Sequence, residues 1–154
     1  MLKPILLVED NPSDLELTLV ALERSQLANQ VVVTRDGVEA IEYLSAAGNW
    51  AGRPAGHPAV ILLDLKLPRI DGLEVLEHIR TTPELKSIPV VMLTSSREEQ
   101  DLVRSYELGV NAYVVKPVVF KEFVDAISDL GMFWAMLNEP PPGSARVERK
   151  PSLG

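Results

Sequence analysis

The chain has 154 residues, of which 46% are hydrophobic and 24% are charged, as in an ordinary soluble globular domain. Its formal net charge of -7 argues against nucleic acid as the main partner, because phosphate backbones attract basic surfaces. The absence of cysteine excludes disulfides and thiolate metal sites. The N-terminus lacks the pattern of a signal peptide, and no apolar run approaches the roughly 20 residues that span a bilayer. We therefore expect a cytoplasmic protein that has no membrane partner.

Five short apolar segments, each followed by a helical pattern, run along the chain. The segments expected to form strands are residues 5–8, 31–33, 60–63, 90–93 and 112–115. Continuous apolar strands that alternate with amphipathic helices are typical of a parallel sheet covered on both faces. The sequence therefore predicts a single α/β domain, a five-stranded, doubly wound, flavodoxin-like three-layer α/β/α sandwich.

Short polar residues mark the starts of three predicted helices. Asn11 precedes a proline at a first helical position. Asp36 and Asp71 are each followed three residues later by a glutamate, at Glu39 and Glu74. This spacing is a variant of the capping box, in which each side chain accepts a hydrogen bond from the backbone N–H of the other residue.

Polar side chains follow four of the predicted strands. In chain order these residues are Glu9, Asp10, Asp64, Thr94 and Lys116. Ligands of doubly wound sheets bind outside the carboxyl ends of the strands, so these side chains are expected to meet at one edge. Crowded carboxylates repel one another unless a cation offsets their charge, and Mg²⁺ prefers carboxylate, phosphoryl and water oxygens. The pattern therefore predicts a magnesium site beside a group that handles phosphate.

Asp64 is the candidate nucleophile, because a carboxylate can take a phosphoryl group as an acyl phosphate. Phosphoryl transfer depends mainly on positioning and on neutralising charge, which the metal, Lys116 and the Thr94 hydroxyl would supply. Each residue alone also has a simpler explanation. Asp64 can cap the next segment. Glu9 and Asp10 can be negative charges that the dipole of the first helix stabilises near its N-terminus. Their occurrence together at successive strand ends favours a shared role.

The segments LLVEDN, LLDLKLPRIDG, VVMLTSS and AYVVKP together resemble the CheY-like receiver domain of two-component response regulators. The resemblance covers about residues 3–130. It implies that a histidine kinase or a phosphotransfer protein donates a phosphoryl group to Asp64. It also implies that Glu9 and Asp10 are an acidic pair, with Asp10 the more direct ligand of Mg²⁺. With Asp64, the backbone carbonyl of Lys66 would complete the protein ligands.

The same resemblance implies further roles along the last two strands. Thr94 and Tyr113 match the switch pair of the family, and the bond from Lys116 to Pro117 matches its cis peptide. Lys66 stands where many receivers carry a polar or neutral residue. A receiver catalyses its own aspartyl phosphorylation and dephosphorylation, so we do not expect an enzyme that acts on a separate substrate.

Three further segments, RDGVEAIEYL, SYELGVNAYVVKP and FKEFVDAISDLGMFW, resemble the small regulators partnered with bacterial phytochromes. We therefore expect a stand-alone receiver over residues 1–137 and a bacteriophytochrome as a candidate kinase. Residues 138–154 are rich in proline, without periodicity, and are predicted to be disordered.

Two other functions compete with the receiver. A phosphatase with an aspartate nucleophile would carry a second aspartate two residues after Asp64, where Lys66 stands instead. A docking adaptor that uses the same fold without phosphorylation remains an alternative, against which the complete set of strand-end residues argues.

The last predicted helix, over residues 118–137, carries more apolar side chains than one buried stripe requires. Its first half is expected to pack on the sheet, and its last two turns to project past the domain, where an exposed apolar patch marks an interface. We therefore expect a homodimer. The candidate interface residues are Phe123, Ile127, Leu130, Phe133 and Trp134.

Overall fold

The structure is a computed structural model and describes residues 3–24, 29–95, 104 and 106–129. Within these residues, five parallel strands form one sheet in the order β2-β1-β3-β4-β5. The strands are β1 (Ile5–Val8), β2 (Val31–Thr34), β3 (Val60–Asp64), β4 (Val90–Thr94) and β5 (Ala112–Val115). The doubly wound parallel sheet is confirmed. Three strands run one residue further than predicted, so Asp64 and Thr94 are the last residues of β3 and β4.

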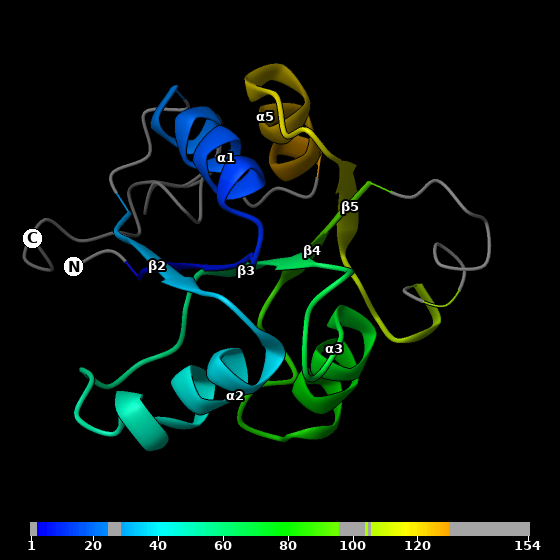
Figure 1. Cartoon of the computed structure of the whole chain (residues 1–154). Coiled ribbons are helices and arrows are strands. Elements are labelled where there is room, and N and C mark those ends of the chain that lie inside the picture. The colour runs from blue at the N-terminus through cyan, green and yellow to red at the C-terminus, as the bar shows by residue number, and fades with distance from the viewer. Residues whose placement is uncertain (1–2, 25–28, 96–103, 105, 130–154) are drawn as a thin grey trace, which may run out of the picture.

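Helices cover both faces of the sheet, which gives the three predicted layers (Figure 1). The elements outside the sheet are α1 (Pro12–Arg24), α2 (Gly37–Ser45), the short 3-10 helix η1 (Gly48–Trp50), α3 (Gly72–Thr81) and α5 (Phe120–Asp129). Helices α1 and α5 lie on one face, and α2 and α3 lie on the other. Each face has its own hydrophobic core, because strands buried on both sides send alternate side chains to opposite faces. In the part of the chain that the structure describes, no helix has the length and apolar character needed to cross a membrane.

The predicted helix starts are present, with one difference in detail. The Asn11 side chain accepts a hydrogen bond from the backbone N–H three residues later, at 2.9 Å. Asp71 and Glu74 form a complete capping box. The Asp36 side chain accepts from the backbone N–H of Glu39 at 2.7 Å, but the Glu39 carboxylate accepts from the N–H of residue 35 rather than from that of Asp36. In this capping box the Glu39 side chain therefore bonds to the backbone one residue before the helix cap.

One of the predicted dimer contacts is wrong. Phe123 is completely buried in the core between α5 and the sheet, where no second chain can reach it. This side chain belongs to the inward face of α5. Ile127 belongs to α5. The remaining positions, Leu130, Phe133 and Trp134, lie outside the described residues, as does the predicted tail over 138–154.

The turn after β3 brings the start of α3 against the end of the strand. A Cβ atom on Gly72, the first residue of α3, would lie 2.3 Å from the Asp64 carbonyl oxygen and 2.8 Å from the Leu65 Cα. The Gly72 N–H donates to the Leu65 carbonyl at 2.9 Å. The backbone that carries the Asp64 carboxylate therefore packs directly on a residue that has no side chain.

We expect Gly72→Ala to lower the free energy of unfolding by about 1–3 kcal/mol, because the added methyl group overlaps backbone atoms that cannot rotate away. Urea denaturation measures this difference. Gly52→Ala is the matched control, since a Cβ atom there would meet no heavy atom within 4 Å. Equal stability of the two variants would contradict the packing argument.

Candidate phosphoryl-acceptor site

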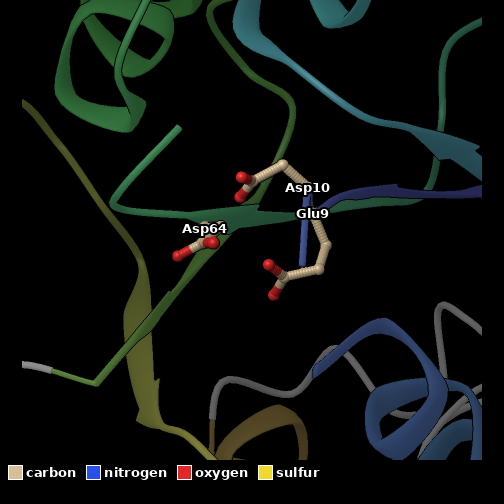
Figure 2. A group of neighbouring side chains, drawn as sticks. All are labelled: Glu9, Asp10 and Asp64. Carbon is tan, nitrogen blue, oxygen red and sulfur yellow. The ribbon is translucent and has the colours of Figure 1, made fainter. Parts of the chain in front are cut away.

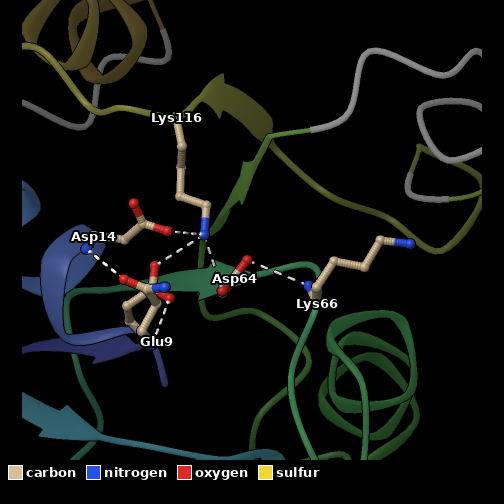
Figure 3. Close-up of polar contacts among 6 residues, drawn as sticks. Glu9, Asp14, Asp64, Lys66 and Lys116 are labelled. Atoms are coloured by element: carbon tan, nitrogen blue, oxygen red, sulfur yellow. Dashed lines mark hydrogen bonds and ion pairs between the residues drawn. The ribbon is translucent and has the colours of Figure 1, made fainter.

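The carboxyl ends of three strands bring buried charges of opposite sign into contact (Figure 3). Lys116 follows β5, and its Nζ lies 3.2 Å from Oε1 of Glu9 and 3.1 Å from Oδ2 of Asp64. The side chains of Lys116, Glu9 and Asp64 are 8%, 0% and 3% exposed. The structure therefore brings these three residues together, as the strand-end argument predicted.

A further carboxylate, Asp14, contacts the same ammonium, and the sequence analysis missed it. Its Oδ2 lies 3.0 Å from Nζ of Lys116. Asp14 lies in the first turn of α1, where its backbone N–H donates to Oδ1 of Asn11. The Asn11 cap was itself the available signal. A helix that begins directly after the acidic pair starts at the same edge of the sheet, so its first turn can reach the site.

Three carboxylates form a group that fits a divalent cation (Figure 2). Glu9, Asp10 and Asp64 each offer one oxygen, and these oxygens all lie within 4.8 Å of one another. Glu9 and Asp64 are buried, whereas Asp10 is exposed. A set of oxygen donors that is open to water on one side suits Mg²⁺, which keeps several of its water ligands.

Lys66 lies at the opposite side of Asp64 from Lys116. Its backbone N–H donates to Oδ1 of Asp64 at 3.3 Å. Its side chain is exposed and points away from the carboxylates in Figure 3. Its ammonium is therefore directed away from Asp64. The metal-binding role of its carbonyl stays a prediction.

Burial and neighbouring charges shift the pKa values of two groups in the site, Glu9 and Lys116. Burial, together with the hydrogen bonding and charge of Asp64, raises the pKa of Glu9 to about 7. Burial alone lowers the pKa of the Lys116 ammonium, but its bonds and charge interactions with Asp14, Asp64 and Glu9 outweigh this, so its pKa lies above the ordinary value. A lysine that stays charged is a fixed positive group for the oxygens around it.

The expected switch residues occupy the neighbouring strands. Thr94 is buried, and its carbonyl accepts the backbone N–H of Lys116 at 2.8 Å. The Tyr113 ring packs edge-on against the exposed Tyr106, with ring centroids 5.6 Å apart. The peptide bond from Lys116 to Pro117 is cis, as the resemblance implied. The movements expected of Thr94 and Tyr113 stay predictions.

Comparison with known proteins identifies relatives of the whole described fold. Residues 5–128 match the family described as response regulator receiver domain. Over 132 residues the chain is 42% identical to the response regulator Rcp1 of Synechocystis sp., covering 86% of this chain and 88% of that protein. The solved structure of the bacteriophytochrome response regulator RtBRR is 68% identical, with a TM-score of 0.83, and the match covers 97% of this chain and 90% of that chain.

Two further relatives have solved structures in a metal-bound or a phosphorylated form. The Mn²⁺-bound form of Rcp1 is 41% identical, with a TM-score of 0.72, over 86% of this chain and 94% of that chain. The phosphorylated cyanobacterial phytochrome response regulator RcpA is 43% identical, with a TM-score of 0.73, over 87% and 94%. In each comparison the similarity extends over most of both chains.

We expect Mg²⁺ to stabilise the fold, because only the folded chain gathers the three carboxylates. At about ten times its dissociation constant, the ion should add about 1.4 kcal/mol to the free energy of unfolding, measured by thermal denaturation. Asp10→Asn should lose most of this gain. Glu77→Gln, which neutralises an exposed carboxylate on α3, should keep it. An equal response to Mg²⁺ in wild type and Asp10→Asn would contradict the assignment.

Without divalent metal, the raised pKa of Glu9 should make stability depend on pH. The folded chain retains the Glu9 proton up to about pH 7, whereas the unfolded chain loses it near the ordinary value of 4.5. The folded state therefore binds more protons in this window, and this group's contribution to stability falls as the pH rises from about 4.5 to about 7. Urea denaturation in the presence of a chelator should give a flatter pH profile for Glu9→Gln than for wild type. Parallel profiles would show that Glu9 does not hold this proton.

Proposed function

Because the chain belongs to the family of response regulator receiver domains, we propose that Asp64 accepts a phosphoryl group from a phosphorylated histidine of a sensor kinase or phosphotransfer protein. The observation that carries this proposal is the buried Asp64 carboxylate at the end of β3, 3.1 Å from the ammonium of Lys116. This carboxylate is ion-paired with Lys116 and is itself one of the three carboxylates that could hold a metal ion. It is therefore oriented and held close to groups that offset phosphate charge.

The proposed transfer makes one bond and breaks one. A carboxylate oxygen of Asp64 attacks the phosphorus, the phosphorus–nitrogen bond to the donor histidine breaks, and the imidazole leaves with the electron pair and takes a proton from water. Lys116 stabilises the negative oxygens of the phosphoryl group as they approach. Thr94, the last residue of β4, is proposed to turn its hydroxyl toward the same group. In the later dephosphorylation, water attacks the phosphorus and the bond from the phosphorus to the Asp64 oxygen breaks. The Asp64 carboxylate is restored and inorganic phosphate leaves.

We propose Mg²⁺ as the physiological ion, held by Asp10, Glu9, Asp64 and the carbonyl of Lys66. When bound, the ion neutralises charge on the phosphoryl oxygens and on the carboxylates. The oxygen-only donor set supports a hard cation, and the Mn²⁺-bound form of the relative Rcp1 supports a divalent one. The chain's own residues supply the orientation of Asp64 and the fixed positive charge of Lys116.

The proposed donor of the phosphoryl group is the histidine kinase of a bacteriophytochrome. We propose that the transfer takes place in the cytoplasm. The similarity to RtBRR and RcpA supports this choice, since both are described as phytochrome response regulators.

We also propose that phosphorylation moves Thr94 and Tyr113 and alters a homodimer interface formed by the last helix. Because Phe123 is buried, that interface would use residues on the outer face of the last helix and residues after position 129. A docking adaptor that never takes phosphate is the competing function.

Incubation with acetyl phosphate and Mg²⁺, followed by intact-mass spectrometry, tests this function. Wild type should gain the mass of one phosphoryl group, and omission of Mg²⁺ or the change Asp64→Asn should abolish the gain. Asp71→Asn is the control, because Asp71 caps α3 without contacting Lys116. A folded wild type that gains no mass from acetyl phosphate or from a phosphorylated kinase would favour the adaptor.

A further inference from the structure

The ammonium of Lys116 has no spare donor in this structure. A lysine ammonium has three N–H groups. Its Nζ lies 3.0 Å from Asp14, 3.1 Å from Asp64 and 3.2 Å from Glu9 (Figure 3). Each N–H therefore has a carboxylate oxygen as acceptor. Any new oxygen that bonds to Lys116 has to replace one of the three.

The three acceptors differ in their access to water. The Glu9 and Asp64 side chains are 0% and 3% exposed, whereas that of Asp14 is 30% exposed. A buried carboxylate that loses its partner keeps the full cost of desolvation, whereas an exposed one can bond to water instead. Asp14 is therefore the acceptor that loses least when Lys116 leaves it.

Hydrogen bonds hold Asp14 against the site. The backbone N–H of Asn11 donates to Oε2 of Glu9 at 3.2 Å, and Oδ1 of Asn11 accepts from the backbone N–H of Asp14 at 2.9 Å. These bonds, with the two ion pairs of Lys116, form a closed ring from Glu9 through Asn11, Asp14 and Lys116 back to Glu9. Asp14 is not part of the described group of carboxylates that could share a metal ion. Its carboxylate contacts the site through the ion pair with Lys116.

We propose that Asp14 competes with the phosphoryl group for Lys116 and thereby restrains the phosphorylated state. While Asp64 is unmodified, Asp14 takes one N–H of the ammonium. A phosphoryl group on Asp64 presents new oxygens to Lys116. The lysine then bonds to one of these oxygens in place of Asp14, and the Asp14 carboxylate bonds to water instead. This inference rests on the proposed function, because it requires that Asp64 carries the phosphoryl group.

Binding of beryllium trifluoride in saturating Mg²⁺ tests the competition at equilibrium, because this anion stands in for a phosphoryl group on the carboxylate. We expect Asp14→Asn and Asp14→Ala to bind it about two- to fivefold more tightly than wild type, and the difference should shrink in 1 M salt, which screens partly exposed charges. Glu16→Gln is the matched control, since it removes an exposed charge from the same helix, away from Lys116. Affinities equal to or weaker than that of wild type in both Asp14 variants would overturn the proposal.

The ¹⁵N resonance of the Lys116 ammonium gives a second, independent measurement. In Asp14→Asn it should shift and broaden without the anion, because one charged acceptor is gone, and it should change little in Glu16→Gln. An unchanged resonance in Asp14→Asn would overturn the proposal. If wild type itself binds no beryllium trifluoride, the proposed function fails, and this result is distinct from equal affinities of wild type and variants.

Discussion

The ammonium of Lys116 is the interaction on which the site depends. It joins residues 52, 102 and 107 positions away along the chain, namely Asp64, Asp14 and Glu9. Glu9 and Asp64 are buried, and buried carboxylates are tolerated only when they are paired, so removal of the lysine that both contact would leave them without this compensating charge. The same arrangement makes Asp64 suitable as a phosphoryl acceptor. A phosphoryl group would add negative charge beside Asp64, and the nearby ammonium of Lys116 can balance part of it. Lys116 thus serves both the stability of the fold and its proposed chemistry.

The strand order explains how one lysine reaches three carboxylates. Strands β1 and β3 are neighbours, so Glu9 and Asp64 start close together. Strand β5 is separated from β3 by β4, and Lys116 has to extend across the end of β4. Its backbone N–H is bonded there to the carbonyl of Thr94. A long aliphatic stem with a compact charge suits this span, and Gly72 lets the backbone under Asp64 stay close to α3.

Much of this arrangement could be predicted from the sequence, because strand patterning is local and parallel strands end at a common edge. Glu9, Asp64 and Lys116 were found in this way. Asp14 was missed because its contact depends on the orientation of the first turn of α1, which a strand-based argument does not consider. Phe123 was assigned to an interface because helical spacing shows that apolar residues share a stripe, but not which part of the stripe the chain itself covers.

The receiver function predicts a single acyl phosphate on a single side chain. After phosphorylation by acetyl phosphate in Mg²⁺, reduction with borohydride converts an aspartyl phosphate to homoserine, and peptide mass spectrometry locates the change. The account predicts this mass change at Asp64 alone, with Glu9, Asp10 and Asp14 unmodified. Modification at another carboxylate, or phosphate on a histidine or hydroxyl group instead, would contradict it.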